Sequence, residues 1–235
     1  SSPIAVGVPG LYNMLADAHS ENGLVSWEKL FEDAIVYSNG FKVGKRLNKL
    51  LNWAPHIKKN NFVLNVYFNG NTPKKTGSII KNLELKKSLE ILSIEPYSLK
   101  NGIIAKSISQ KLKGYISQND LNSWKTIKRS SICQLYQGYK VCGFPPPTSG
   151  GISVLQILGI LSYNINSINK NSSLSTTHFF LEASRLAYLD RDFYIADPSY
   201  FNVPTDLLLS EKYLKGRSKL INRNKSIDSF ERGKS

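Results

Sequence analysis

The chain has 235 residues, of which 41% are apolar, enough for one large domain or two small ones with a substantial core. Its formal net charge is +14, and no run of about 18 consecutive apolar residues occurs, which excludes a membrane-spanning helix. The lysines are scattered and do not form one basic stripe with interleaved aromatic residues. We therefore attribute the positive charge to a compositional bias toward lysine and not to a nucleic-acid-binding surface. We therefore predict neither a nucleic-acid partner nor a membrane partner.

The N-terminal part of the chain is predicted to be helical. Apolar residues recur at helical spacing over residues 11–18, and Gly23 is expected to end that helix. A second helix should begin near Ser26, a good N-cap residue, and end in a left-handed cap at Asn39-Gly40. Residues 43–51 favour a short third helix.

The middle of the chain has a mixed pattern. Residues 62–68 predict a β-strand, and Asn69-Gly70 predicts a turn after it. Leucines over residues 85–92 indicate one helix, and apolar residues over 104–115 indicate the next. Residues 136–142 are expected to be extended.

Two cysteines, Cys133 and Cys142, lie nine residues apart with a predicted turn at Gln137-Gly138 between them. If the flanking residues pair as a hairpin, the thiols lie close enough for a disulfide, which would fit an oxidising compartment. Two free thiols on short strands are the alternative, and the sequence leaves both open. A metal site is not expected, because the spacing is wrong and the three histidines show no ligand pattern.

After these cysteines comes the sequence Phe-Pro-Pro-Pro-Thr-Ser-Gly-Gly at residues 144–151, followed by an apolar stretch at 152–161. Each proline ring fixes φ, so we expect the three prolines to hold an extended segment. The two glycines then allow the backbone to turn and begin a helix. The apolar face of that helix is predicted to consist of Val154, Leu155, Leu158 and Leu161.

The C-terminal part shows the clearest helical pattern. Residues 164–173 are expected to form a polar loop, and 175–191 a helix. One side of this helix is predicted to carry Phe179, Ala183, Leu186, Ala187 and Asp190. Ser210 is expected to cap a last helix that runs through Ile221. Residues 222–235 are charged and nearly free of apolar side chains, which predicts a mobile tail.

Several charges lie close together at Asp190-Arg191-Asp192 and Asp197-Pro198. Paired carboxylates can do acid–base work or bind a cation. The alternative is an ion-paired helix end, with Asp197-Pro198 starting the next turn. We favour the ion-paired helix end, because nothing else in the sequence imposes a site there.

Three blocks, in order, resemble the large subunit of the γ-glutamyltranspeptidase family. The first is AVGVPG at residues 5–10, with the helices through 27–35 that follow it. The second is YQGYKV at 136–141 with PPPTSGG at 145–151, and the third is EASRLAY at 182–188 with the charged segment after it. Together the blocks span residues 4–221, and their order and separation make the resemblance stronger than any one of them alone.

The resemblance implies an α+β fold of the N-terminal-nucleophile hydrolase type, with an αββα architecture. Residues 1–221 would form part of the large subunit, mainly helical with a few strands, and 222–235 would be the tail. The implied reaction cleaves the γ-glutamyl amide of glutathione and related γ-glutamyl compounds through a γ-glutamyl-enzyme. No metal or organic cofactor is implied. Members are commonly exported, so the resemblance implies a periplasmic or secreted protein, although the sequence shows no signal peptide.

The stretch Thr176-Thr177-His178-Phe179 looks like the start of the family's small subunit, where the first Thr is the nucleophile. Here the same letters lie before a sequence that favours a helix, whereas the family's nucleophile leads into a strand. We therefore interpret this match as coincidental. His178 also matches a helical position of the third block, which supports that interpretation.

The departures from the family concern the catalytic parts. The family's Arg-Glu motif, whose arginine holds the substrate α-carboxylate, precedes AVGVPG, and the nucleophilic Thr and oxyanion-hole residues belong to the small subunit. We therefore assign no catalytic, substrate-binding, cofactor-binding or metal residue to this chain. The expected partner is a small-subunit segment that carries the Thr nucleophile, and the chain alone is expected to be inactive.

Three alternatives are left open by the sequence. In the first alternative, the chain is a fragment of a related N-terminal-nucleophile acylase that cleaves another side-chain amide. In the second, it is an inactive truncated relic of the family. The third alternative is a non-catalytic basic binding protein, which would bind DNA or RNA with a steep dependence on salt. The scattered charge argues against this last alternative.

Overall fold

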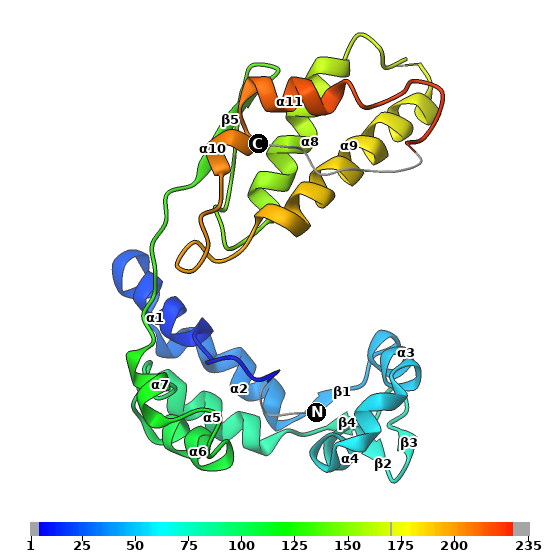
Figure 1. The fold of residues 1–235 in the computed structure, drawn as a ribbon. Helices are drawn as coiled ribbons and strands as arrows, with labels where there is room; N and C mark the ends of the chain where they lie inside the picture. Colours follow the sequence, from blue (N-terminus) through cyan, green and yellow to red (C-terminus); the bar gives the residue numbers. More distant parts are fainter. Residues whose placement is uncertain (1–4, 170, 228–235) are drawn as a thin grey trace. The chain divides into compact units, whose positions relative to one another are not determined.

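The computed structural model describes residues 5–169 and 171–227, and the chain divides into two compact units, 1–127 and 128–235 (Figure 1). Helices predominate in both units, with a few strands, as the sequence predicts, and the described strands form short antiparallel pairs. None of the described helices is both long and apolar enough to span a bilayer. Residues 228–235 of the predicted tail lie outside the described residues.

The first unit opens with α1 (Leu11–Asn22), which ends at Gly23 as predicted. The second predicted helix differs from expectation. It begins as a 3-10 turn, Glu28–Phe31, and continues as α2 (Glu32–Asn39), and no side chain caps either start. The predicted left-handed cap is wrong, because Gly40 is extended (φ 163°). Gly40 leads directly into β1 (Phe41–Lys42), which pairs with β4 (Ile79–Ile80).

Between β1 and β4 lies a small helical segment (residues 43–78). It contains α3 (Lys45–Trp53), the 3-10 helix η3 (Pro55–Lys59), α4 (Asn61–Tyr67), and the strand pair β2 (Phe68–Asn69) with β3 (Thr72–Pro73). The third predicted helix is confirmed by α3. The turn after Asn69 is confirmed as well, with Gly70 at φ 59°.

The strand predicted at residues 62–68 is wrong, because nearly all of it is α4. The side-chain oxygen of Asn60 accepts hydrogen bonds from the backbone N–H groups of Phe62 (2.9 Å) and Val63 (3.3 Å). This N-cap satisfies two donors that the first turn of a helix leaves open, and so favours the helix over the β-propensity of the apolar residues. Only Phe68, at the end of the run, joins a strand.

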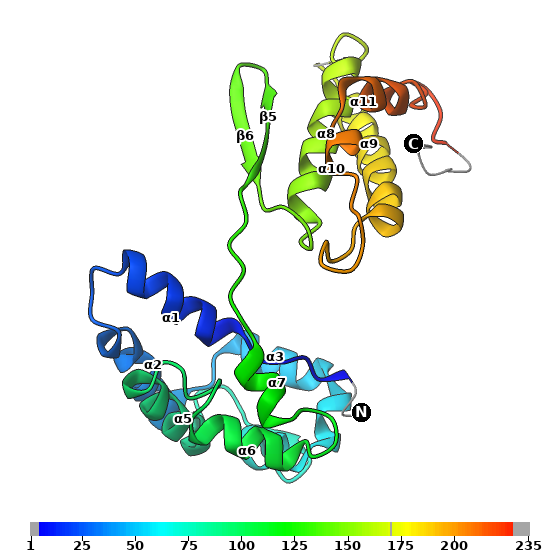
Figure 2. The ribbon, with the colours of Figure 1, turned by 60° about the vertical axis from the view of Figure 1, so that its left-hand side comes forward.

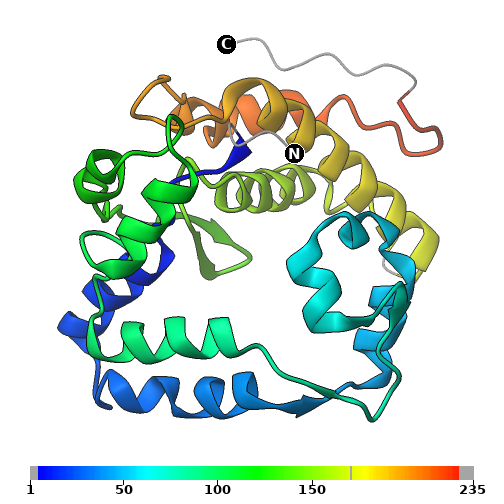
Figure 3. The same cartoon turned by 90° about the horizontal axis from the view of Figure 1, so that it is seen from below.

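The remaining helices of the first unit are α5 (Leu83–Ile94) and α6 (Ile103–Lys111), which confirm the helices expected at 85–92 and 104–115, and α7 (Gln118–Ser123), which was not predicted. Helices α2 and α5 lie side by side (Figure 3). The core between them is formed by Phe31, Leu89, Leu92 and Leu99. The indole N–H of Trp27 donates to the carbonyl of Leu92 (2.8 Å), so this half-buried aromatic residue has its polar group satisfied.

The carboxylate of Asp17 joins three parts of the first unit. It accepts a hydrogen bond from the hydroxyl of Tyr97 (2.7 Å) and another from the hydroxyl of Thr126. Asp17 lies on α1, Tyr97 follows α5, and Thr126 follows α7. The hydrogen bond from Tyr97 raises the pKa of its phenol, and partial burial and the negative charge of Asp17 add to that effect.

The second unit begins with the hairpin β5 (Ile132–Tyr136) and β6 (Tyr139–Gly143), which extends beside the helices (Figure 2). Its turn residues Gln137 (φ 48°) and Gly138 (φ 85°) are both left-handed, as a two-residue hairpin turn requires. The helices that follow are α8 (Gly150–Asn164), α9 (Ser173–Tyr194), α10 (Thr205–Leu208) and α11 (Glu211–Ser218).

Helix α9 confirms the clearest prediction from the sequence. All five residues expected along one side are buried, namely Phe179, Ala183, Leu186, Ala187 and Asp190. The side chain of Ser172 caps its start. Ser210 caps α11 as predicted, but α11 ends at Ser218, and Ile221 reaches the core from the loop after it.

The apolar face predicted for α8 is only partly right. Leu155 is buried, but Val154 is 50% exposed. The most deeply buried side chains of α8 are instead Ile152, Leu155, Gln156 and Ile160. In so apolar a helix the hydrophobic pattern does not define one face, and contacts with α9 and α11 decide which residues are buried.

Candidate functional site

The hairpin of the second unit is closed by a disulfide. Cys133 and Cys142 are directly opposite each other in the β5–β6 register, with their Cα atoms 4.1 Å apart, and their sulfur atoms are bonded. The sequence left a disulfide and two free thiols open, and the structure contains the disulfide. It fixes the hairpin one residue before β6 ends at Gly143.

The sequence predicts that the three prolines hold an extended segment. This prediction is wrong in part, because the proline run contains a turn. The Pro146-Pro147 peptide bond is cis, and these two residues reverse the chain before α8 begins at Gly150. The two glycines do begin a helix, as predicted. Gly151 lies so close to the hairpin that an added Cβ would meet the carbonyl oxygen of Phe144 at 2.1 Å. A Cβ on Gly143 would likewise meet the Cα of Gly151 at 2.6 Å.

A pocket of about 190 Å³ lies where the hairpin meets α8. Its lining consists of Val141, Cys142, Gly143, Gly150, Gly151, Val154 and Leu155. The side chains that line it are apolar and it contains half of the disulfide, so it suits an apolar group better than a charged substrate. It therefore offers no catalytic group.

The start of α8 is tied to the end of α9 by Arg191. Its Nε donates to the hydroxyl of Ser149 (2.9 Å), and its Nη1 lies 2.5 Å from the carboxylate of Asp192. Asp197 accepts a hydrogen bond from the backbone N–H of Ser199 (2.9 Å), which is the main cause of its lowered pKa. The guanidinium of Arg129 lies 3.8 Å from the same carboxylate.

These contacts confirm that the charged segment is an ion-paired helix end. Asp197 starts a turn in which its carbonyl accepts from the backbone N–H of Tyr200 (3.0 Å). Within residues 5–169 and 171–227, no group of three or more acidic, His or Cys side chains is arranged to hold a metal ion.

Asp190 belongs to a buried polar cluster under α8. Its carboxylate lies 2.8 Å from Nη2 of Arg217, and the amide of Gln156 donates to it (3.2 Å). The same Gln156 amide also reaches the carbonyl of Leu208 (3.3 Å). Burial first, and the neighbouring Asp190 second, raise the pKa of the nearby Tyr213.

Gln156 and Arg217 were not predicted from the sequence to be members of this cluster. The available signal was a charged residue, Asp190, on the apolar side of α9, since a buried carboxylate requires partners from neighbouring elements. Because every charged member is paired within the core, the cluster is a structural feature.

The Thr-Thr-His-Phe stretch lies inside α9, as the sequence analysis predicted. The hydroxyl of Thr176 donates to the carbonyl of Ser172 (3.3 Å), a bond that holds it against its own helix. Nε2 of His178 contacts the carbonyl of Asn222 (2.7 Å). Thr176 is thus a helical residue with its α-amine in a peptide bond, and it lacks the free amine that activates an N-terminal nucleophile.

Comparisons with known proteins agree with the fold. The family model described as gamma-glutamyltranspeptidase matches residues 1–234. The glutathione hydrolase proenzyme of Escherichia coli K12 is 30% identical over 98% of this chain and 41% of its own length. An acylase ACY 1 proenzyme of Pseudomonas sp. V22 is 28% identical over 92% of this chain and 40% of its own length.

Among solved structures, the γ-glutamyltranspeptidase of Helicobacter pylori superimposes with a TM-score of 0.87 at 26% identity, covering 97% of this chain and 67% of that one. The fold is therefore the mixed α+β fold of N-terminal-nucleophile hydrolases. The chain belongs to the γ-glutamyltranspeptidase family, which is a family of enzymes. It spans about 40% of the length of the curated relatives it matches.

Proposed function

We propose that the chain is a large-subunit portion of a γ-glutamyltransferase or glutathione hydrolase, and that it works with a small-subunit segment that carries the nucleophilic Thr. The observation that carries the proposal is the family match over residues 1–234. The placement of Thr176 within α9 supports a nucleophile outside this chain. The described residues would then supply scaffold for the catalytic segment.

In the proposed reaction, the hydroxyl of the Thr nucleophile attacks the γ-carbonyl carbon of the substrate. The C–N bond of the amide breaks, the amine leaves with a proton, and a γ-glutamyl ester remains on the enzyme. Water then hydrolyses the ester, or an amino acid accepts the γ-glutamyl group. We assign no step to a metal or an organic cofactor, and no catalytic or substrate-binding role to a residue of this chain.

The proposal is tested on the protein as its gene encodes it. We would measure the denatured mass of each polypeptide, sequence the N-terminus of any companion chain, and assay turnover of glutathione and a chromogenic γ-glutamyl anilide. A companion beginning with Thr, together with turnover, is the expected result. A lone chain near 26 kDa without turnover would overturn the proposal and identify a truncated relic. Turnover by the isolated 235-residue chain would show that the nucleophile had been misplaced.

An acylase function is the second candidate, because the ACY 1 proenzyme matches nearly the same part of the chain at similar identity. Its substrate would be another side-chain amide, such as an acylated β-lactam precursor. Both activities share the acyl-enzyme chemistry, so substrate choice separates them. Side-by-side rates on the γ-glutamyl anilide and on the acylated β-lactam decide between the two.

A further inference from the structure

The positive charge of the first unit is concentrated in one stretch. Residues 34–83 contain no Asp or Glu and nine basic side chains, which are Lys42, Lys45, Arg46, Lys49, Lys58, Lys59, Lys74, Lys75 and Lys81. The stretch therefore has a formal charge of +9, out of +14 for the whole chain. No carboxylate lies within the stretch, and the nearest acidic residues in sequence are Asp33 before it and Glu84 after it. The lysines are therefore less scattered than the sequence analysis describes, because this one stretch has a large net positive charge.

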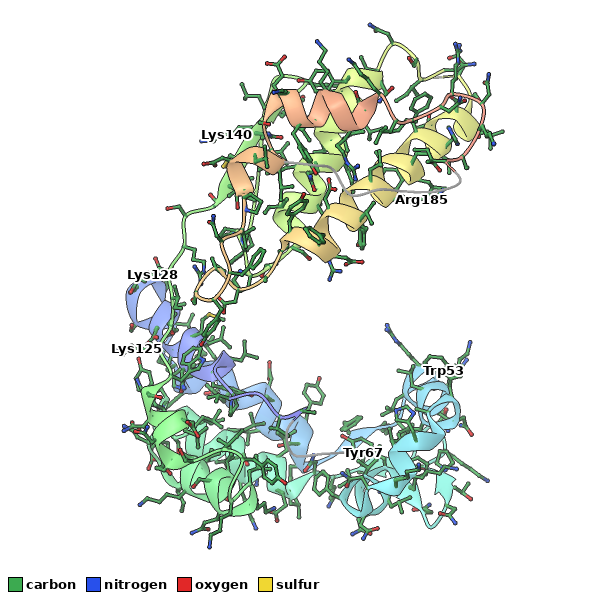
Figure 4. The ribbon with its side chains drawn as sticks, in the orientation of Figure 1. Trp53, Tyr67, Lys125, Lys128, Lys140 and Arg185 are labelled. Atoms are coloured by element: carbon green, nitrogen blue, oxygen red, sulfur yellow. A yellow bond between two sulfur atoms is a disulfide. The ribbon has the colours of Figure 1, made fainter. Side chains whose placement is uncertain are left out.

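Helix α3 presents this charge together with apolar side chains on one exposed face. Leu51 is buried and Leu47 is half-buried, so the opposite side of the helix faces outward. On that outer side lie the basic residues Lys45, Arg46 and Lys49. Two apolar residues share it: Leu50 is 45% exposed and Trp53 is 80% exposed, and Figure 4 marks Trp53 on α3.

The spacing along α3 interleaves the two kinds of side chain. Leu50 follows Arg46 by four residues, and Trp53 follows Lys49 by four, so each apolar side chain neighbours a cation on the helix surface. Such a face leaves Trp53 in water when nothing covers it, although an indole is most stable with its ring in an apolar layer and its N–H in a polar one.

Helix α4, the next α-helix in the chain, also begins with exposed basic and apolar side chains. Phe62 in its first turn is 47% exposed, and Lys59 just before it is also exposed. Two other cations of the segment are engaged within the fold. The ammonium of Lys58 lies 5.6 Å from the ring centroid of Phe68, and that of Lys74 donates to the carbonyl of Val66 (2.8 Å).

We propose that α3, with the start of α4, is a contact surface for an anionic lipid bilayer. The lysines would lie at the headgroups, and Leu50, Trp53 and Phe62 would enter the boundary with the acyl chains. A surface contact of this kind differs from a membrane span, which the described helices do not provide. The proposal differs from the expectation, drawn from the sequence, that the protein has no membrane partner.

The composition of the surface favours lipid over nucleic acid. Of the four basic residues on this surface, Lys45, Lys49 and Lys59 are lysines and only Arg46 is an arginine, so planar bidentate contacts to phosphate or base edges are scarce. Leu50 has no ring on which a base can stack, yet it suits the acyl-chain boundary. Lysine with Trp, Leu and Phe is the combination that helices lying on a membrane surface use.

The test uses vesicles of phosphatidylcholine alone and of phosphatidylcholine with phosphatidylglycerol, and the protein as its gene encodes it. We expect binding to the anionic vesicles that weakens as salt is added. The triple variant Lys45→Glu, Arg46→Glu, Lys49→Glu should bind at least about ten-fold more weakly. The matched control is Lys106→Glu, Lys111→Glu, Lys113→Glu, which makes the same charge change at exposed positions on and after α6 and should bind like the wild type.

Trp53 supplies a readout of insertion. The tryptophan emission of the wild type should shift to the blue on anionic vesicles, and Trp53→Gln should abolish that shift while leaving Trp27 and Trp124 in place. Far-UV circular dichroism checks that each variant is folded. Equal binding to neutral vesicles, an equal loss in the α6 control, or no shift from Trp53 would overturn the proposal. So would tighter binding to an oligonucleotide than to the anionic vesicles.

Discussion

The guanidinium of Arg217 on α11 lies 2.8 Å from the carboxylate of Asp190 on α9, and both side chains are at most 4% exposed. The pair therefore joins the two helices that flank α8 through a contact sheltered from solvent. A buried charge without its partner is far less stable than a buried pair, so loss of either residue should destabilise the fold.

Asp190→Ala should lower the free energy of unfolding of the second unit by about 3–5 kcal/mol, because it leaves Arg217 buried without its carboxylate. Combining it with Arg217→Met should cost much less than the sum of the two single changes. Urea unfolding followed by circular dichroism measures both. Asp192→Ala is the control, because that carboxylate is 66% exposed and its loss should cost at most about 1 kcal/mol. Additive losses in the double variant would contradict the pairing.

Gly151→Ala should destabilise the junction of hairpin and helix. The new Cβ would lie 2.1 Å from the carbonyl oxygen of Phe144, a backbone atom that cannot move aside without shifting the chain. We expect a loss of about 1–3 kcal/mol or more in unfolding free energy. Gly150→Ala is the matched control, since nothing lies within 4 Å of a Cβ there. It should be neutral or slightly stabilising, and equal effects at the two positions would refute the close contact.

Tyr97→Phe should weaken the first unit in a pH-dependent way. The hydrogen bond to Asp17 raises the pKa of Tyr97, so folding favours the neutral phenol. Because Tyr97 is 39% exposed, solvent screens this bond, and its contribution is at most about 0.5–1 kcal/mol. The contribution is fully present below the unfolded pKa near 10 and is lost as pH rises through the higher folded value. The stability gap between wild type and variant should therefore be largest at pH 7–9 and shrink above pH 10. Tyr115→Phe, at an exposed position, should show no such gap.

Thr176→Ala should leave γ-glutamyl turnover of the complete protein unchanged within about two-fold, because Thr176 is a helical residue with its hydroxyl bonded to its own backbone. Release of any companion chain by self-cleavage should also be unchanged in this variant. Steady-state rates and denaturing gels measure both. A loss of turnover without a loss of folded protein would show that Thr176 takes part in the chemistry.

The sequence predicted the elements whose pattern is reinforced by several signals at once. Helix α9 combines an N-cap at Ser172 with an uninterrupted apolar side, and both local preference and packing favour the same structure. The strand predicted at 62–68 was wrong because its apolar residues suit either a strand or a buried helix. Asn60, two residues before that segment, favours the helix by capping its start.

Contacts between distant residues were the part that sequence patterns did not supply. Nothing near Gln156 in the sequence indicates that it meets Asp190 and the carbonyl of Leu208, which lie 34 and 52 residues away. The turn at Pro146-Pro147 was missed for a different reason, since a proline run is compatible with an extended chain as well as with a reversal.

The contact between Gly143 and Gly151 also has a mechanical consequence. Where two elements meet through side chains, rotamer changes absorb small displacements of one against the other. Here the two backbones touch directly, and no side chain stands between them. A shift or twist at the disulfide end of the hairpin should therefore pass directly to the first turn of α8, and from there to the buried Gln156, five residues after Gly151 in the same helix.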